Sequence, residues 1–285
     1  METLSIPQSV LDKEARLKGI LLELGSVAVA FSGGVDSSFL SAVCAQTLPG
    51  RTVLVTGRSA SFPERERTAA GALARELGLK HVVVDSEELN LEGFSQNPPN
   101  RCYLCKLALF GKIKAVAEAE GVNQVIEASN ADDEGDYRPG LTAISELGIR
   151  SPLREARLEK SEIRLLSKRL GLSTWDKPSF ACLASRFPYG ETITVERLER
   201  VDKAESFLLQ LGLKQVRVRF HDQGELARIE TDDEGLALLM EPAIRPKVAE
   251  RFRSLGFLYS AVDITGYRTG SMNLTLPEGQ GKRPD

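Results

Sequence analysis

The sequence feature that most constrains the fold is a short loop rich in glycine and serine, between an apolar run and a helical pattern. The loop reads Ser-Gly-Gly-Val-Asp-Ser-Ser at residues 32–38. It follows the apolar run Val27–Phe31 and precedes a helical pattern that extends to about Gln46. Glycine lets the backbone approach a ligand closely, and the unpaired N–H groups of such a loop and of the first helical turn bind anions. The order of strand, loop and helix predicts a phosphate-binding site; the alternative is an ordinary turn that binds no ligand.

This loop differs from the P-loop of kinases and GTPases, which ends in Gly-Lys-Ser/Thr. It has no lysine and carries Asp36 instead. It resembles the PP-loop of ATP pyrophosphatases, enzymes that cleave ATP between the α and β phosphates. The resemblance implies that ATP and Mg²⁺ bind at this loop. The residues expected to bind them are Ser32, Gly33, Gly34, Asp36, Ser37 and Ser38.

Strand and helix patterns alternate over the first part of the chain. Strand patterns lie at Val27–Phe31, Thr52–Thr56, His81–Val84 and Gln124–Ala128. The alternation predicts parallel strands joined by right-handed crossovers, with the ligand at the carboxyl ends of the strands. Helices are expected at Ser9–Leu24, Glu64–Leu77, Leu107–Ala119, Leu141–Leu147 and Ser161–Leu170, the last with Ser161 as its N-cap.

After Thr194 the pattern changes to that of a smaller α+β domain. Its strands are expected at Gln215–Phe220, Leu226–Glu230 and Phe257–Ile264, and its helices at Val195–Leu211, Asp232–Leu239 and Pro246–Leu255. We therefore predict an α/β fold: a parallel-sheet PP-loop domain of the adenine nucleotide alpha hydrolase type at residues 1–190 and an α+β domain at 191–276. Residues 277–285 are expected to form a disordered tail.

Composition excludes several classes of protein. No apolar run approaches the length that spans a bilayer, and residues 1–18 lack the apolar core of a signal peptide, so a cytoplasmic enzyme without a membrane partner is expected. The net charge is −3 and no long basic run occurs, which argues against a nucleic-acid partner. In such a chain the 4 cysteines are expected to be ligands, nucleophiles or core residues rather than disulfides.

Three cysteines are candidates for chemistry. Cys102-x-x-Cys105 by itself fits half a zinc site, a redox pair or part of an iron–sulfur site. Together with Cys182 the pair matches a [4Fe–4S] cluster with one open iron; zinc and unliganded thiols stay open. Cys182 lies near Ser185-Arg186, where a cation lowers a thiol pKa, so it fits a ligand, a nucleophile or a buried linker residue. Cys44, within an apolar helical pattern, is expected in the core.

A pair of arginines forms a second candidate group. Arg217 and Arg219 alternate with apolar residues, so both guanidinium groups point to one face of the predicted strand. Two adjacent guanidinium groups make a bidentate clamp for a phosphate or carboxylate. The alternative is an exposed strand face with cross-strand partners such as Arg228 or Glu230.

An acidic segment follows the fourth predicted strand. Residues 129–140 are too polar for a core and lie at another strand carboxyl end. They suit Mg²⁺ or the polar groups of a substrate, and the alternative is a solvated turn.

Three further motifs carry a closer resemblance. They are Asp-Glu-Gly-Asp-Tyr-Arg-Pro-Gly at 133–140, Ser-Arg-Phe-Pro-Tyr-Gly at 185–190 and Val-Arg-Val-Arg-Phe-His at 216–221. With the PP-loop, they make nearly the whole chain resemble the LarE family of ATP-dependent sulfur transferases. Those enzymes make the nickel-pincer nucleotide cofactor of lactate racemase and its relatives.

The resemblance implies a reaction and roles for residues. A carboxylate of pyridinium-3,5-biscarboxylic acid mononucleotide attacks the α phosphate of ATP, pyrophosphate leaves, and sulfur displaces AMP from the acyl-adenylate to give a thiocarboxylate. Arg217 and Arg219 would hold the substrate phosphate. Ser185 and Arg186 would line the site, and Glu205 and Glu230 match acidic positions of the family's second site and are candidate metal ligands. Asp36, Cys182, Ser185 and Arg186 are the expected catalytic residues. The family further suggests a homo-oligomer, a hexamer.

The sulfur source divides the family. One type sacrifices a single cysteine, and the other uses three cysteines to hold a [4Fe–4S] cluster that carries sulfide. Because Cys102, Cys105 and Cys182 are all present, this chain resembles the cluster type, supplied by sulfide or another sulfur donor. Rival interpretations are a PP-loop tRNA thiolation enzyme, an amide-forming PP-loop enzyme and a non-catalytic nucleotide- or metal-binding protein.

Overall fold

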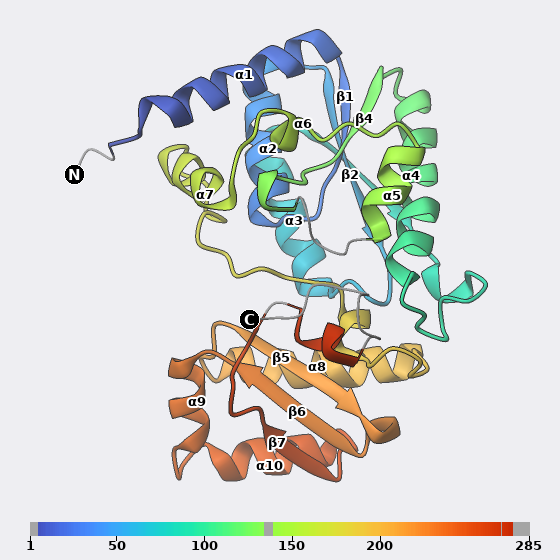
Figure 1. The fold of residues 1–285 in the computed structure, drawn as a ribbon, viewed down its shortest axis with the longest axis vertical. Helices are drawn as coiled ribbons and strands as arrows, with labels where there is room; N and C mark the ends of the chain where they lie inside the picture. The colour runs from blue at the N-terminus through green and yellow to red at the C-terminus, as the bar shows by residue number, and fades with distance from the viewer. Residues whose placement is uncertain (1–4, 134–138, 269, 276–285) are drawn as a thin grey trace. The chain divides into compact units, whose positions relative to one another are not determined.

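The computed structural model describes residues 5–133, 139–268 and 270–275 (Figure 1). The chain divides into two compact units. The first unit comprises Met1–Ser86 and Cys102–Phe180, and the second comprises Glu87–Arg101 and Ala181–Asp285. In the described parts of the chain, no helix combines the length and apolarity that crossing a membrane requires.

The first unit is built on a parallel sheet of four strands in the order β3-β2-β1-β4. The strands are β1 (Val27–Ala30), β2 (Thr52–Arg58), β3 (Lys80–Asp85) and β4 (Gln124–Ile126). The predicted α/β fold with a parallel sheet is confirmed. The chain adds β2 and β3 on one side of β1 and then places β4 on the other side, so the strand order reverses at β1. The carboxyl end of β1 is therefore the topological switch point, where open α/β sheets bind their ligands.

Helices cover both faces of this sheet, as Figure 1 shows. Alternate residues of β1 point to opposite faces: Val27 and Val29 belong to the larger core, and Ala28 belongs to the smaller one. Helices α1 (Gln8–Leu24), α2 (Val35–Thr47), α3 (Glu64–Glu76), α6 (Pro152–Glu155) and α7 (Lys160–Arg169) contribute to the larger core, and α4 (Arg101–Ala119) and α5 (Pro139–Glu146) contribute to the smaller one. Two short 3₁₀ helices also lie in this part of the chain: η1 (Glu88–Asn90), which belongs to the second unit, and η2 (Ala131–Asp133), which belongs to the first.

The second unit contains a three-stranded sheet in the order β5-β6-β7. Strands β5 (Val216–His221) and β6 (Leu226–Thr231) are antiparallel, and β7 (Tyr259–Val262) pairs with β6 in parallel. Every residue of β5 except His221 is buried, because its apolar face packs toward Phe187 and Phe257 while its other face lies inside a polar network. The helices are α8 (Val195–Gln210), α9 (Asp233–Met240) and α10 (Arg245–Ser254), with 3₁₀ helices η3 (Leu183–Arg186), η4 (Asp222–Gly224) and η5 (Ser271–Thr275).

Two helix starts differ from the sequence prediction. The expected start of α4 at Leu107 is wrong, since the helix begins at Arg101, whose N–H donates to the carbonyl of Pro98 at 2.9 Å. Pro98 and Pro99, residues typical of a loop, stand just before the helix, where proline removes no helical hydrogen bond. Cys102 and Cys105 therefore lie inside α4.

The second difference concerns α7. The predicted N-cap at Ser161 is wrong, because Glu159 caps the helix in a reciprocal capping box with Glu162.

The chain passes from one unit to the other after Ser86, Arg101 and Phe180, whereas the expected domain boundary lies after residue 190. The predicted disordered tail at 277–285 and residues 134–138 of the acidic motif lie outside the described residues.

Candidate active site

The phosphate loop, Ser32–Ser38, lies at the carboxyl end of β1, as predicted from its place between strand and helix. Gly33 adopts a φ of 68°, a left-handed conformation that favours glycine. A Cβ at this position would lie 2.9 Å from the Cβ of Ala70 on α3, so a side chain would also collide with that helix. The glycine thus permits both the turn and the close packing of the loop on α3.

Serine hydroxyls hold the loop in shape. The Oγ atoms of Ser32 and Ser37 lie 3.1 Å apart in hydrogen-bond contact, and Ser37 Oγ also donates to the Gly34 carbonyl at 3.3 Å. The Oγ of Ser38 is buried and has no hydrogen-bond partner among the described residues. Gly34 is the N-cap of α2, so the loop leads directly into the first helical turn, whose unpaired N–H groups can bind an anion. The loop geometry suits a phosphate.

Asp36, in the first turn of α2, joins two segments from later in the chain. Its carboxylate forms an ion pair with Lys160, the first residue of α7, and accepts a hydrogen bond from Asn130 Nδ2 at 3.3 Å. Asp132 and Asp133, from the acidic segment, instead accept backbone N–H groups: that of Lys160 at 2.9 Å and that of Asn130 at 3.0 Å. The described part of the acidic segment therefore contacts Asp36 through Asn130, and Asp132 and Asp133 hold the backbone of Lys160 and Asn130 in place.

A second lysine reaches the same loop. Lys177 Nζ donates to the Gly33 carbonyl at 3.0 Å and pairs with Glu66 of α3 at 2.7 Å. Sequence reasoning missed both Lys160 and Lys177. They lie 124 and 144 residues from their loop partners, and a single lysine in a helix start or an irregular segment carries no signal of its own.

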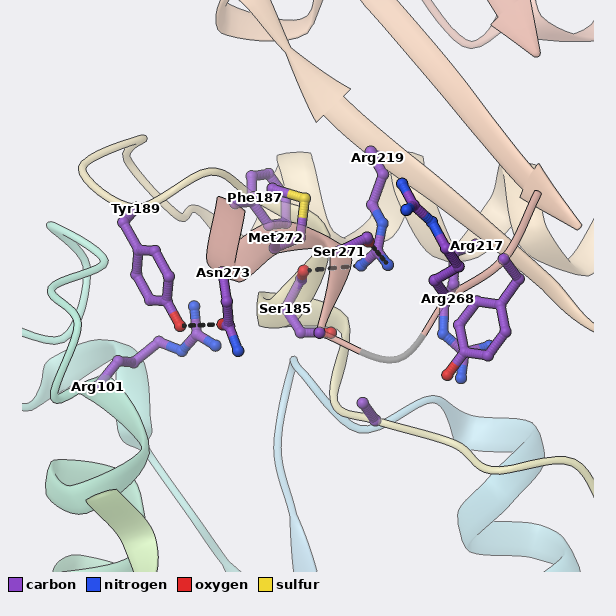
Figure 2. Close-up of a pocket in the computed structure, with 13 residues that line it drawn as sticks. Arg101, Ser185, Phe187, Tyr189, Arg217, Arg219, Arg268, Ser271, Met272 and Asn273 are labelled. Carbon is purple, nitrogen blue, oxygen red and sulfur yellow. Dashed lines mark hydrogen bonds between the residues drawn. The ribbon is translucent and has the colours of Figure 1, made fainter. Parts of the chain in front are cut away.

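The second unit contains a cavity of about 150 Å³, here named the arginine pocket. Arg217 and Arg219 of β5 line it together with Arg101 and Arg268, which sequence reasoning missed. Figure 2 shows Arg101 toward one end of this pocket and Arg217 and Arg268 toward the other. Ser185 also lines it. The group is cationic and suits an anionic ligand.

The two predicted arginines of β5 are buried, with 5% of Arg217 and 4% of Arg219 exposed, so the strand face is not exposed as the alternative expected, although the expected cross-strand partner Glu230 does pair with Arg219. Arg219 donates to the Ser185 carbonyl at 3.0 Å, to Ser271 Oγ at 2.9 Å and to Glu230 at 2.6 Å (Figure 2 draws the first two contacts). The Arg217 guanidinium lies over the ring of Tyr267 at 5.0 Å from its centroid.

Burial and the nearby charge of Arg186 lower the pKa of Arg217 to about 10. Burial disfavours the charged form of the guanidinium, and the carboxylate of Glu205 only partly opposes this effect. An anionic ligand would reverse that effect. A phosphate role for Arg217 and Arg219 stays a prediction.

Arg186 and Glu205 form a buried ion pair in the second unit. The guanidinium donates twice to the carboxylate, at 2.8 and 2.9 Å, and Glu205 also accepts the N–H of Val218 at 2.9 Å. Burial has the largest influence on the pKa of Glu205 and raises it, but the charge and hydrogen bonds of Arg186 outweigh burial and the pKa is lowered. Arg186 links η3 to α8, while its neighbour Ser185 lines the pocket.

Glu230 is the second candidate acidic residue for a metal. Its carboxylate accepts from Arg219, Arg228 and Ser271. Like Glu205, it is held by arginines, which a metal ion would have to displace. Across residues 5–133, 139–268 and 270–275, no three His, Cys, Asp or Glu side chains are grouped in a way that could hold a metal ion. The metal role of Glu205 and Glu230 stays a prediction.

The four cysteines differ in burial. Cys44 lies in the larger core, as expected, and burial raises the pKa of its thiol. Cys102 is exposed and Cys105 is half-buried; at a spacing of three on α4 they share one helix face. Cys182 is half-buried, and its carbonyl accepts from the N–H of Ser185 at 3.0 Å. The residues of the predicted trio thus differ from Cys44 in being exposed or half-buried rather than buried in the core, and their role as cluster ligands stays a prediction.

Comparisons with known proteins decide the family. The model of the asparagine synthase family matches residues 21–93, which contain the phosphate loop and the first three strands. The chain is 42% identical over 264 residues to an uncharacterized protein of Synechocystis sp., which covers 93% of this chain and 98% of that protein. It is 36% identical over 269 residues to the pyridinium-3,5-bisthiocarboxylic acid mononucleotide synthase of Lactiplantibacillus plantarum, covering 94% of this chain and 96% of the synthase. The chain belongs to the LarE family.

This LarE-family chain is an ATP-dependent sulfurtransferase with a PP-loop domain. A weaker similarity, 27% identity over 190 residues, links it to the tRNA-specific 2-thiouridylase MnmA of Bradyrhizobium sp.. That match covers 53% of this chain and 47% of MnmA, whereas the LarE match covers both units. The similarity to MnmA extends to about half of the chain.

Proposed function

We propose that this enzyme converts the carboxylates of pyridinium-3,5-biscarboxylic acid mononucleotide to thiocarboxylates, a step in making the nickel-pincer cofactor of lactate racemase. The observation that carries the proposal is the arginine pocket of the second unit. Four arginines line it, which suits the phosphate of a mononucleotide. The similarity to a synthase named for the bisthiocarboxylic acid product supports the same substrate.

The first half of the reaction forms an acyl-adenylate. A substrate carboxylate oxygen attacks the α phosphorus of ATP, the bond between the α phosphorus and the bridging oxygen breaks, and pyrophosphate leaves with the bonding electron pair. The phosphate loop donates N–H and hydroxyl groups to the departing pyrophosphate. Asp36 offers the carboxylate oxygen that suits Mg²⁺, the metal expected with ATP.

The second half transfers sulfur. A sulfide attacks the acyl carbon, AMP leaves with the electron pair of its bond to the acyl group, and a thiocarboxylate is formed; a second round gives the bisthiocarboxylic acid. In this proposal Arg217 and Arg219 hold the substrate phosphate and Ser185 lines the site. Arg186 positions Ser185 and β5 through its buried pair with Glu205.

The sulfur source is part of the proposal. We assign Cys102, Cys105 and Cys182 as the cluster ligands because these residues are exposed or half-buried, whereas Cys44 is buried in the core. A [4Fe–4S] cluster bound by these three residues would supply sulfide at its open iron, replenished by a sulfur donor. We expect Cys102→Ser to lose the visible absorption, the iron and the sulfide of anaerobically prepared enzyme, and to lose multiple turnover. Cys44→Ser is the matched control. Full activity of Cys102→Ser under excess sulfide would contradict this assignment.

The test of the reaction is acceptor-dependent release of pyrophosphate. Pyridinium-3,5-biscarboxylic acid mononucleotide should stimulate release from ATP and Mg²⁺, and mass spectrometry should find product in which one and then two oxygens are replaced by sulfur. Stimulation by tRNA and not by the mononucleotide would overturn the proposal in favour of RNA thiolation. The same preparations, measured by light scattering, test the proposed homo-oligomer, a hexamer by family resemblance.

A further inference from the structure

The phosphate loop has a charge deficit that its own residues do not meet. Cleavage between the α and β phosphates builds negative charge on the departing pyrophosphate, and phosphoryl-transfer sites stabilise such charge with cations. The loop contains no lysine or arginine, and its one charged residue, Asp36, is acidic. Any cationic side chain for the departing phosphates must come from elsewhere in the chain.

Lys160 is the first such cation. Its ammonium group pairs with Asp36, and its backbone N–H donates to Asp132 at 2.9 Å, which fixes the start of α7 beside the loop. The pair is partly open, with 28% of the Lys160 side chain and 23% of Asp36 exposed. A ligand can therefore reach the ammonium group, and a long lysine side chain moves without a shift of the backbone.

Lys177 is the second. It donates to the Gly33 carbonyl and pairs with Glu66, with 21% of its side chain and 15% of Glu66 exposed. Arg164 of α7 holds the backbone around it by donating to the carbonyls of Trp175 at 2.8 Å and Lys177 at 2.9 Å. Helix α7 thus begins with one of these lysines and anchors the segment that carries the other.

We propose that Lys160 and Lys177 are the cationic phosphate contacts of the loop, in place of the lysine that its sequence lacks. Each ammonium group leaves its carboxylate when nucleotide binds and donates to oxygens of the β and γ phosphates. The exchange frees Asp36 for the metal that accompanies ATP. Both lysines stay protonated while pyrophosphate leaves, so no proton changes hands. The inference rests on the ATP-cleaving half of the proposed function.

The experiment compares two nucleotides that differ in their outer phosphates. Calorimetry measures the binding of α,β-methylene-ATP, which resists cleavage between the α and β phosphates, and of AMP, which lacks both outer phosphates. We expect Lys160→Met and Lys177→Met each to weaken α,β-methylene-ATP binding about tenfold or more, and to leave AMP binding within about twofold. Lys160→Arg and Lys177→Arg should restore much of the loss, because arginine keeps the charge.

Lys80→Met is the matched control, because Lys80 is also ion-paired, with Glu120, but lies at the opposite, amino end of β3. Wild-type affinity for α,β-methylene-ATP in both methionine variants would overturn the inference. An equal loss for AMP and α,β-methylene-ATP would also overturn it, since that result indicates a structural role. Neither measurement uses the sulfur acceptor, so failure of the proposed substrate would leave this result interpretable.

Discussion

The phosphate loop and the arginine pocket are both proposed to bind anions, yet they are built in opposite ways. The loop is seven consecutive residues whose shape depends on the φ of Gly33 and on a pair of serine hydroxyls. The pocket collects side chains from separate segments, including Arg101, Ser185, the two arginines of β5 and Arg268. A site made by local backbone geometry is visible in the sequence, whereas one made by converging segments is visible only in part.

The two sites also differ in how their ions are held. The Lys160–Asp36 and Lys177–Glu66 pairs beside the loop are partly exposed, with 15–28% of each side chain in contact with solvent, so exchanging a partner for a ligand costs less desolvation than at a fully buried pair. The Arg186–Glu205 pair of the second unit, next in sequence to the pocket residue Ser185, has 0% and 1% of its side chains exposed. Breaking such a pair leaves a buried charge without compensation. We infer that the pairs at the loop can rearrange on binding, whereas this pair supports the second unit.

The largest expected effect breaks the buried pair. Glu205→Gln should reduce the free energy of unfolding by about 3–5 kcal/mol, because the Arg186 guanidinium stays buried without a counter-charge. Thermal and urea denaturation of the full chain measure the loss. Glu234→Gln is the control, since the Lys214–Glu234 pair is 73% and 79% exposed and its removal should change stability little. Equal losses of stability in the two variants would contradict the claim that the buried pair stabilises the fold more than the exposed pair does.

A smaller effect separates the two sites functionally. Arg217→Gln should lower kcat/KM for the mononucleotide in acceptor-dependent pyrophosphate release by about a hundredfold, because a buried charge-assisted contact to phosphate is lost. Binding of α,β-methylene-ATP should stay unchanged, and calorimetry measures it. If ATP-analogue binding fell as much as acceptor use, the assignment of separate anions to the loop and the pocket would be wrong.

The pH dependence of stability sharpens the same comparison. The folded pKa of Glu205 lies below its ordinary value of 4.5, so the stabilisation from its ion pair is complete above that value and is lost as pH falls through the folded pKa. The difference in Tm between wild type and Glu205→Gln should be constant from about pH 7 to about pH 5 and should shrink at more acidic pH. A difference that grew on acidification would contradict the lowered pKa.

The smallest expected effect concerns the helix that carries Lys160. Glu159→Ala removes the N-cap of α7 and should reduce the free energy of unfolding by about 1 kcal/mol, whereas Ser161→Ala should change it little. Denaturant titration of both variants measures the difference. If Ser161→Ala destabilised the protein more than Glu159→Ala, Ser161 would be the N-cap, as the sequence predicted.

Much of the fold was predictable, for identifiable reasons. The buried strands β1 and β2 are short apolar runs bounded by turn residues, and their alternation with helices leaves few topologies. The starts of α4 and α7 were not predictable, because in each case the local sequence offers more than one residue at which the helix could begin. Proline before Arg101 reads as a loop, and Ser161 is a better N-cap by type than Glu159.

By itself, the sequence determined the phosphate loop, the parallel sheet and the candidate pair Arg217 and Arg219, because periodicity and glycine act over a few residues. Only the tertiary structure decided which charged groups pair. Lys160 and Lys177 lie at the loop, Glu205 pairs with Arg186, and Glu230 pairs with Arg219. The sequence around a charged side chain does not indicate which residue it will pair with. The fold brings the partners together, and the burial of the pair determines how much breaking it destabilises the protein.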